Sequence, residues 1–500
     1  MTFDLVGILV FVVAAFLYAA FIPARGRGWF IFVGSTLAIF WLQPPLPIRF
    51  SDYILPTATL LLTVLTWWLT RIPGDPDQLK SKHEDRISLA IMAALVIGLA
   101  FFRFVDAEYR LTPSRPPSPL TVAIVLGLIG AAFAGFFWML GRRSSGGREE
   151  SKTEISGKVF SLFIVFIVVL FVVLKTEALS SGLSRFWRGI TGQDASLASP
   201  IDLQWLGFSF VAFRLLHTLR DRQTGLLPTL SLREYVSYVV FFPSYTAGPL
   251  DRAERYVKDY RELPRIRGLD PSRFASGFER ILIGLLKKFV IADLLVQGIS
   301  LNATNAAQAQ SSAGLWVLLY GFALRIYFDF GGYSDIAIGI GLLFGVKLPE
   351  NFNRPYLRNN ITAFWQSWHI TLSNWVRFYV FTPLSRWMLR RTWRPPTLII
   401  VFIAQMTTMI IIGLWHGVTF NFFIWGVWHG VALFAHKVWS DRTRKWYREM
   451  STRPWRKRAW TVATWFLTFN YVAIGWVWFA LPSISQSATV FGRMFGFGWT

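Results

Sequence analysis

The sequence predicts an all-α, polytopic integral membrane protein with roughly eleven to thirteen hydrophobic segments, some of them re-entrant. Hydrophobic residues make up 53% of the 500 residues and aromatic residues make up 17%. The mean hydropathy is +0.42. Apolar runs of about 20 residues, the length of a spanning helix, recur along the whole chain. These runs are continuous, whereas the strands of a membrane β-barrel alternate apolar and polar residues.

The net charge and the cysteine count narrow the function classes. A net charge of +23 would suggest a nucleic-acid partner for a soluble protein. Here the basic residues cluster in short loops beside apolar segments, so membrane lipids and the positive-inside rule explain them, and we expect no nucleic-acid partner. The absence of cysteine excludes disulfides, thiolate catalysis and cysteine-ligated metals. Arg25 and Arg27 follow the first apolar segment, which predicts an N-terminus outside the bacterial inner membrane.

The first third of the chain predicts membrane helices that serve as a scaffold, and it offers no candidate catalytic residue. Long charged loops at 71–86 and 141–158 are expected in the cytoplasm, and Pro-rich loops at 44–52 and 106–119 are expected outside. The helices that these loops join are predicted at residues 3–22, 29–42, 53–70, 87–105, 120–140 and 159–177.

The middle of the chain departs from plain spanning helices. Segment 235–250 (YVSYVVFFPSYTAGPL) is short, contains two prolines and has arginines on both flanks. It predicts a re-entrant hairpin beside a cavity, because irregular backbone at membrane depth needs protein or water around it. Gly331 and Gly332, in FDFGGYSD, are expected to break the helix that begins near Leu315.

A polar stripe marks the stretch from Thr362 to Arg377. Thr362, Gln366, His369, Ser373 and Arg377 are spaced four, three, four and four residues apart. This spacing places them on one face of a helix, with aromatic residues mainly on the other faces. We expect such a polar face at membrane depth to meet protein or water rather than lipid.

His416 is the strongest candidate for catalysis. It lies in GLWHG between two apolar runs, and a neutral imidazole in a low-dielectric cavity is a suitable general base. His369 could orient a substrate or stabilise the reacting carbonyl. From the residues alone, a helix-packing role for the Trp-His-Gly motif explains His416 about equally well. His429 is interpreted as structural, and a metal site is disfavoured because no carboxylate lies between His416 and His429.

Four blocks follow one another in the second half of the chain: FFPSYTAGPL (241–250), FDFGGYSDIAIGIGLLFGVKLPENFNRPY (328–356), FWQSWHITLSNWVRFYV (364–380) and GLWHGVTFNFFIWGVWHG (413–430). Together they resemble the membrane-bound O-acyltransferase family. Within it they are most similar to the bacterial branch that includes the alginate O-acetylation membrane protein and the teichoic-acid D-alanyl transfer protein. The resemblance implies an intramembrane tunnel, with an acyl donor arriving from the cytoplasm and an acceptor outside. It matches the family's invariant histidine to His416 and its second polar position to His369.

We therefore expect an O-acyltransferase, most simply an O-acetyltransferase, that acylates a hydroxyl of an extracytoplasmic polysaccharide or related glycan. The expected donor is acetyl-CoA, another acyl-CoA or an acyl-carrier thioester, with no bound cofactor or metal. The resemblance implies a periplasmic acyltransferase or esterase-like partner. A transporter or channel is the alternative, because broken helices and intramembrane Arg and His also occur in transporters. The absence of an internal repeat counts against that alternative.

The expected site has a chemical part and a binding part. His416 and His369 are expected to carry the chemistry. The basic segment 385–396 is expected to bind donor phosphates, since Arg side chains form forked hydrogen bonds to phosphate. The substrate-binding residues expected are Gln366, Ser373, Arg377, Asn353, Trp415, Arg390 and Arg394. By role we divide the chain into N-terminal helices (1–200), a catalytic core (201–440) and a basic loop with the last helix and an external tail (441–500).

Overall fold

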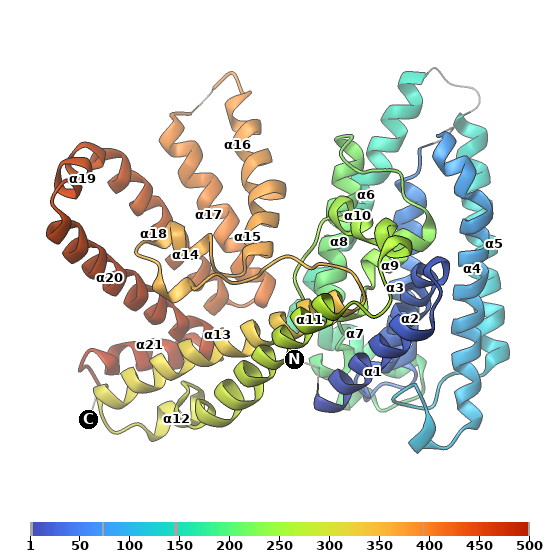
Figure 1. Cartoon of the computed structure of the whole chain (residues 1–500), viewed down its shortest axis with the longest axis horizontal. Coiled ribbons are helices and arrows are strands. Elements are labelled where there is room, and N and C mark those ends of the chain that lie inside the picture. Colours follow the sequence, from blue (N-terminus) through green and yellow to red (C-terminus); the bar gives the residue numbers. More distant parts are fainter. Residues whose placement is uncertain (1–3, 73–74, 145–148, 394, 499–500) are drawn as a thin grey trace. The chain divides into compact units, whose positions relative to one another are not determined.

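The computed structural model describes residues 4–72, 75–144, 149–393 and 395–498, whose regular elements are all helices (Figure 1). The predicted all-α membrane class is confirmed, since six described helices are long and apolar enough to cross a membrane. Two shorter apolar helices accompany them. The predicted total of roughly eleven to thirteen segments stays a prediction, because it depends on helices shorter than one bilayer crossing.

The chain forms two compact units. Unit 1 comprises Met1–Ala275 and Ile340–Leu348, and unit 2 comprises Ser276–Gly339 and Pro349–Thr500. The division by role at residues 200 and 440 stays a prediction.

In unit 1 each of the six predicted N-terminal segments is found as one helix. Helix α4 begins earlier than expected, because Asp75 caps it and its charged first turns are helical. The helices of unit 1 are α1 (Leu5–Phe21), α2 (Arg27–Trp41), α3 (Ser51–Leu69), α4 (Pro76–Ala100), α5 (Pro119–Ser144), α6 (Glu149–Lys175), α7 (Glu177–Ile190), α8 (Phe208–Gln223), α9 (Leu232–Val239) and α10 (Ala253–Glu262).

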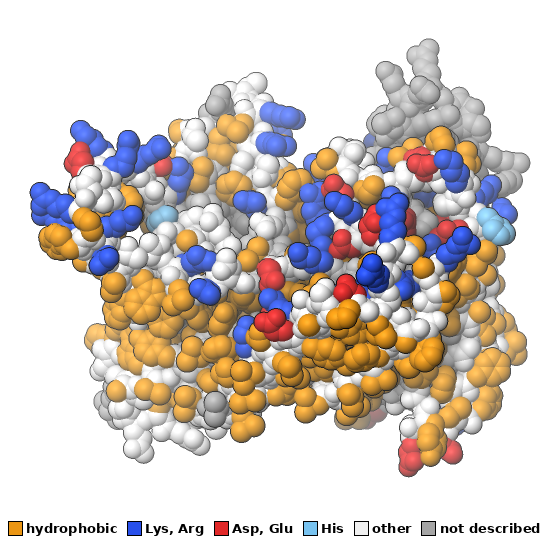
Figure 2. Space-filling model, in the orientation of Figure 1, with side chains coloured by type: hydrophobic (Ala, Val, Ile, Leu, Met, Phe, Trp, Pro, Cys, Tyr) orange, Lys and Arg blue, Asp and Glu red, His pale blue; other side chains and the backbone are white. Residues whose placement is uncertain are grey.

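The loops of unit 1 gather at the two ends of α3. After α3, the hydroxyl of Thr229 donates to the Asp75 carboxylate at 2.7 Å. Before α3, the side-chain amide of Gln193 donates to the carbonyl oxygen of Pro47 at 3.0 Å. Most Lys and Arg side chains of this unit that Figure 2 displays lie toward the Asp75 end. We call this the basic end of unit 1.

Segment 235–250 forms the predicted hairpin inside unit 1. Arg214 of α8 donates to the carbonyl oxygens of Val239 at 2.6 Å and Ser244 at 2.8 Å. Arg252 then pairs with Asp221 near the end of α8 at 3.4 Å, so the chain returns to the end that it left. All but one of residues 241–250 are buried, so protein surrounds this backbone where we expected a cavity.

In unit 2 the regular elements include two π-helices, Leu286–Leu295 and Arg377–Phe381. The α-helices, of which α11 and α13 extend into unit 1, are α11 (Pro271–Leu285), α12 (Ala303–Gln308), α13 (Ser312–Leu343), α14 (Ile361–Trp365), α15 (Ile370–Val376), α16 (Thr382–Leu389), α17 (Thr397–His416), α18 (Phe420–Arg442), α19 (Arg444–Ser451), α20 (Pro454–Ala480) and α21 (Ile484–Met494).

The break expected at 331–332 was wrong, because α13 is continuous through it. Its glycines serve packing instead. A Cβ atom on Gly332 would lie 2.7 Å from the carbonyl oxygen of Gly284, and one on Gly339 would lie 2.7 Å from that of Gly277. The glycines therefore let α11 and α13 approach backbone to backbone.

Helices α17 and α18 also lie side by side through glycine contacts (Figure 1). A Cβ atom on Gly413 would overlap the carbonyl oxygen of Phe422, and one on Gly426 would lie 2.6 Å from that of Met409. The sequence between the two helices is short, since α17 ends at His416 and Thr419 caps α18. This close pair fixes the place of the GLWHG motif.

Candidate functional site

His369 lies at a sharp turn between two helices. Helix α14 ends at Trp365, and α15 begins at Ile370 with His369 as its N-terminal cap. The backbone of His369 is left-handed, with φ 41° and ψ 53°. Such a conformation is uncommon outside glycine and persists only where the surroundings hold it, often at functional sites.

Asn351 holds this turn. Its carbonyl oxygen accepts the N–H of Ile370 at 2.9 Å, and its side-chain oxygen accepts the hydroxyl of Thr371 at 2.6 Å. Its amide donates to the Ser334 hydroxyl on α13 at 3.2 Å. The single helix expected from Thr362 to Arg377 was therefore wrong, because Asn351 takes the N–H group that would continue it.

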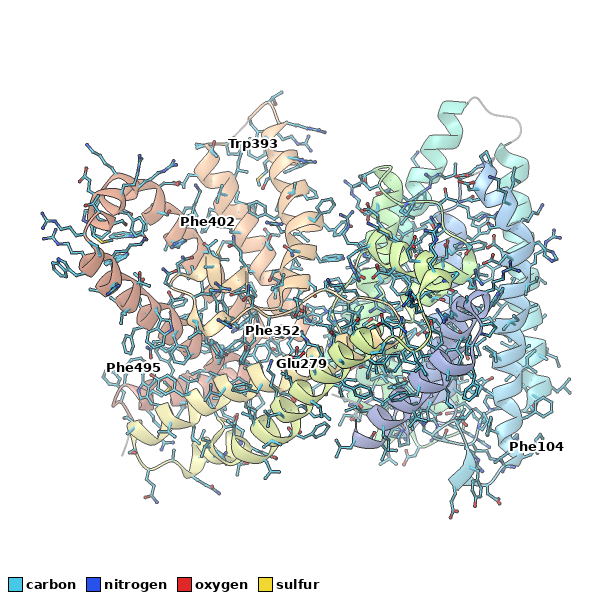
Figure 3. All side chains as sticks on the ribbon, viewed as in Figure 1. Phe104, Glu279, Phe352, Trp393, Phe402 and Phe495 are labelled. Carbon is cyan, nitrogen blue, oxygen red and sulfur yellow. The ribbon has the colours of Figure 1, made fainter. Side chains whose placement is uncertain are left out.

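The imidazole of His369 is enclosed by aromatic rings. The Phe330 ring lies 4.7 Å from it and the Trp415 ring 5.9 Å, centre to centre. Phe352, labelled in Figure 3, contacts Phe330 and Trp368 on the same wall. Only 3% of His369 is exposed, and both ring nitrogens are buried without a hydrogen-bond partner among the described residues. A buried polar group in this condition is costly, so a substrate group that pairs with it gains free energy.

His416 is the last residue of α17 and is half-buried. Its ring lies 4.6 Å from Trp415 and 4.7 Å from Phe479. The indole ring of Trp415 thus contacts both imidazole rings, at 5.9 Å from His369 and 4.6 Å from His416, and so places the two histidines near each other. The C-terminal end of a helix carries partial negative charge, which stabilises an imidazole that has taken up a proton.

Three predicted binding residues line one cavity in unit 2. Gln366, Ser373 and Arg377 border a space of about 260 Å³, together with residues of α17 and α18. The three residues line the same space although the predicted helix is broken, because α14, α15 and the π-helix Arg377–Phe381 all border it. His369 does not line this cavity, since the turn moves it away from the stripe.

The α17 wall of the cavity continues to the catalytic candidate. Gln405, Met409 and Ile412 line it, and their spacing of four and three residues places them on one helix face. His416 follows Ile412 by four residues and continues that face. The lining on α17 ends at Ile412, one helical turn before His416, so a molecule that extends from the cavity along this face would reach His416.

The other expected binding residues lie apart from the cavity lining. Asn353 is exposed, and its N–H donates to the carbonyl oxygen of Ser367 at 3.0 Å. Arg390 is exposed and caps the C-terminal end of α16. Arg394 lies outside the described residues. Their roles in substrate binding stay predictions.

The acids upstream of the histidines form ion pairs. Asp335 lies 2.6 Å from Lys287 and 2.6 Å from Arg280, and Asp329 lies 2.5 Å from Lys288. These pairs join α13 to α11 and the π-helix that follows it. Within the described ranges, no group of three His, Cys, Asp or Glu side chains is arranged to hold a metal.

The remaining histidines have other surroundings. His429 is fully buried, with Trp425 at 4.8 Å and Trp365 at 5.2 Å, and its ring nitrogens also have no hydrogen-bond partner among the described residues. Its structural role stays a prediction. The Nδ1 atom of His436 forms a hydrogen bond with the hydroxyl of Thr362 at 2.9 Å.

Sequence reasoning missed two residues at this site, Asn351 and Gln405. Asn351 lies in the block 328–356, but the residue whose N–H it accepts, Ile370, lies 19 residues further along the chain. Gln405 is the one amide in a long apolar helix, which is the signal that could have found it.

Comparison with known proteins places these features in a family. The profile described as MBOAT, membrane-bound O-acyltransferase family, matches residues 138–480. A probable alginate O-acetylase AlgI of Pseudomonas putida is 34% identical over 296 residues, which cover 59% of this chain and 56% of the relative. A peptidoglycan O-acetyltransferase of Helicobacter pylori is 35% identical over 263 residues, covering 53% and 46%. A teichoic acid D-alanyltransferase of Bacillus subtilis is 29% identical over 303 residues, covering 60% and 74%. The chain spans about half the length of the two O-acetylating relatives.

Proposed function

Because the chain belongs to the membrane-bound O-acyltransferase family, we propose that it is a membrane enzyme that transfers an acyl group, most simply acetyl, from a thioester to a glycan hydroxyl. The observation that carries this proposal is the convergence of His416 and His369 on Trp415, beside a cavity that leads along α17. The names of the relatives support hydroxyls of a polysaccharide, peptidoglycan or teichoic acid as the class of acceptor.

In the proposed reaction His416 is the general base. It takes the proton of the acceptor hydroxyl while the hydroxyl oxygen bonds to the thioester carbonyl carbon. The carbon–sulfur bond then breaks, the acyl group stays on the acceptor oxygen as an ester, and the sulfur takes the proton from His416 and leaves as a thiol. His369, with no partner for its buried nitrogens among the described residues, donates a hydrogen bond to the carbonyl oxygen as negative charge develops there.

The donor, its route and the partner belong to the same proposal. The donor is acetyl-CoA, another acyl-CoA or an acyl-carrier thioester, because a thioester carbonyl reacts without a metal or a bound cofactor. The protein lies in a bacterial inner membrane with its N-terminus outside. The basic ends of its helices face the cytoplasm, as the positive-inside rule favours. Arg390 and Arg394 there bind the donor phosphates. Asn353 contacts the acceptor, and a periplasmic acyltransferase or esterase-like protein completes delivery.

The test is His416→Ala in purified protein held in nanodiscs. We expect loss of acetyl transfer from acetyl-CoA to a glycan acceptor by at least about a hundredfold, the usual size of a general-base contribution. Gel filtration and thermal unfolding would show that the variant is folded. Full activity in a folded His416→Ala variant would overturn the mechanism. Solute uptake by liposomes without thioester turnover would favour the transporter alternative.

A further inference from the structure

Gln405 is the one amide of α17, its side-chain oxygen is buried, and the mechanism above does not use it. It lines the 260 Å³ cavity beside Met409 and Ile412. Its side-chain carbonyl oxygen is shielded from solvent, and none of the described residues donates a hydrogen bond to it. An amide oxygen buried without a donor costs about 1–3 kcal/mol, so a polar group that enters this cavity with an N–H or O–H would relieve it.

The position of Gln405 along α17 sets its distance from the reacting centre. Eleven residues separate it from His416, a rise of about 16 Å along the helix axis. The two side chains lie on one face of α17 and lean in the same direction, so this separation is kept. A ligand whose reacting carbonyl lies at His416 would meet Gln405 only with a part remote from that carbonyl.

The cavity that Gln405 borders, on the side of α17 that leads to His416, suits a slender, mostly apolar chain. Ile412, Met409, Val376 and Phe381 supply apolar walls. Arg377 borders the same space with an exposed guanidinium, which favours an anionic group at that part of the wall.

A pantetheine arm has this distribution of groups. It carries a thioester at one end, one amide close to the sulfur, and a pantoyl half with a second amide N–H and a hydroxyl farther away. Its remote end bears a phosphate in both CoA and acyl-carrier proteins. We infer that Gln405 accepts a hydrogen bond from the pantoyl half of the donor's pantetheine arm, and so selects donors by a group remote from the reacting thioester.

This inference rests on the proposed acyl transfer and names the part of the donor that the cavity recognises. The test compares two synthetic donors, acetylpantetheine and the acetyl thioester of N-acetylcysteamine. The second donor keeps the thioester and the near amide but lacks the pantoyl half. The protein is the full chain in nanodiscs, as wild type and as Gln405→Leu, which removes the acceptor oxygen.

We expect Gln405→Leu to raise the KM for acetylpantetheine about three- to tenfold with kcat unchanged, the effect of one neutral hydrogen bond. The KM for the N-acetylcysteamine thioester should stay as in wild type. Acetyl-CoA and an acetylated carrier protein should show the same rise as acetylpantetheine, since both carry the arm. The matched control is Ile403→Leu, on the exposed side of the same helix, which should change neither KM.

Three results would overturn the inference. One is an equal effect of Gln405→Leu on both synthetic donors, which would indicate a general packing role. Another is no effect on either donor. The third is a wild-type protein that transfers acetyl from none of the thioesters. That result would overturn the proposed function as well, whereas the first two results would leave the proposed function standing. If Gln405→Leu does not fold, Gln405→Met, of nearly equal length, serves the same comparison.

Discussion

His369 and Asn351 show how one buried amide can hold a neighbouring turn in an uncommon backbone conformation. The left-handed backbone of His369 would relax without a restraint, and Asn351 supplies that restraint through Ile370 and Thr371. Asn351 itself is fully buried. In the proposed reaction it is a positioning residue, since its atoms contact the turn and not the imidazole of His369.

At the residue scale we predict that Asn351→Ala lowers kcat by about ten- to a hundredfold while the donor KM stays within about twofold. Small misplacements of a reacting group have effects of this size on the chemical step. Steady-state kinetics in nanodiscs would measure both constants, with gel filtration as the measure of folding. Thr371→Ser keeps the hydroxyl and should retain activity, whereas Thr371→Val should lose part of it. A matched rise of KM and fall of kcat would contradict a positioning role.

At the scale of elements, the α17–α18 pair positions GLWHG through glycine. Gly413 faces the backbone carbonyl of Phe422, whereas Gly430 faces the flexible end of Met406, whose sulfur would lie 2.7 Å from an added Cβ. Backbone cannot move aside as a methionine side chain can, so the two sites should respond differently to the same added methyl group.

We predict that Gly413→Ala lowers the thermal unfolding temperature in detergent by several degrees, from an overpacking cost of about 1–3 kcal/mol. It should also reduce activity, because His416 lies on the same last turn of α17. Gly430→Ala is the matched control and should unfold within about two degrees of wild type. Equal unfolding temperatures for the two variants would show that the protein has room for a methyl group between Gly413 and the carbonyl oxygen of Phe422.

The elements also show what sequence patterns can and cannot predict. The apolar helices follow from local hydropathy: α1, α2 and α3 lie where they were predicted, and α3 is long and apolar enough to cross a membrane. The turn at His369 depends on Asn351, which is distant in sequence, so the local period of the polar stripe predicted one helix. The stripe still identified three cavity residues, because α14, α15 and the π-helix that follows border the same cavity. Gln405 stands out as the one amide of its apolar helix, but no local pattern shows that it borders the same cavity as the stripe.

At the scale of the whole molecule, the sorting of basic loops predicts the orientation in the membrane. The chain has no cysteine, so one introduced cysteine is a clean reporter. Lys80 is exposed at the basic end of unit 1, and Ser196 is exposed in the loops at the other end. We expect a membrane-impermeant maleimide to label Ser196→Cys in intact spheroplasts and to label Lys80→Cys only after the membrane is opened. The reverse pattern would invert the proposed topology, and with it the side from which the donor arrives.

The glycine contacts between α11 and α13 bear on how this chain can change over evolution. Gly277 and Gly284 are seven residues apart, and so are their partners Gly339 and Gly332. Inserting or deleting one residue between the members of either pair would rotate one glycine by about 100° away from its partner helix. Substitutions on the outward faces of these helices leave the contacts intact, but a change of length breaks one of them. This stretch should therefore diverge by substitution and keep its length, while insertions accumulate in the loops.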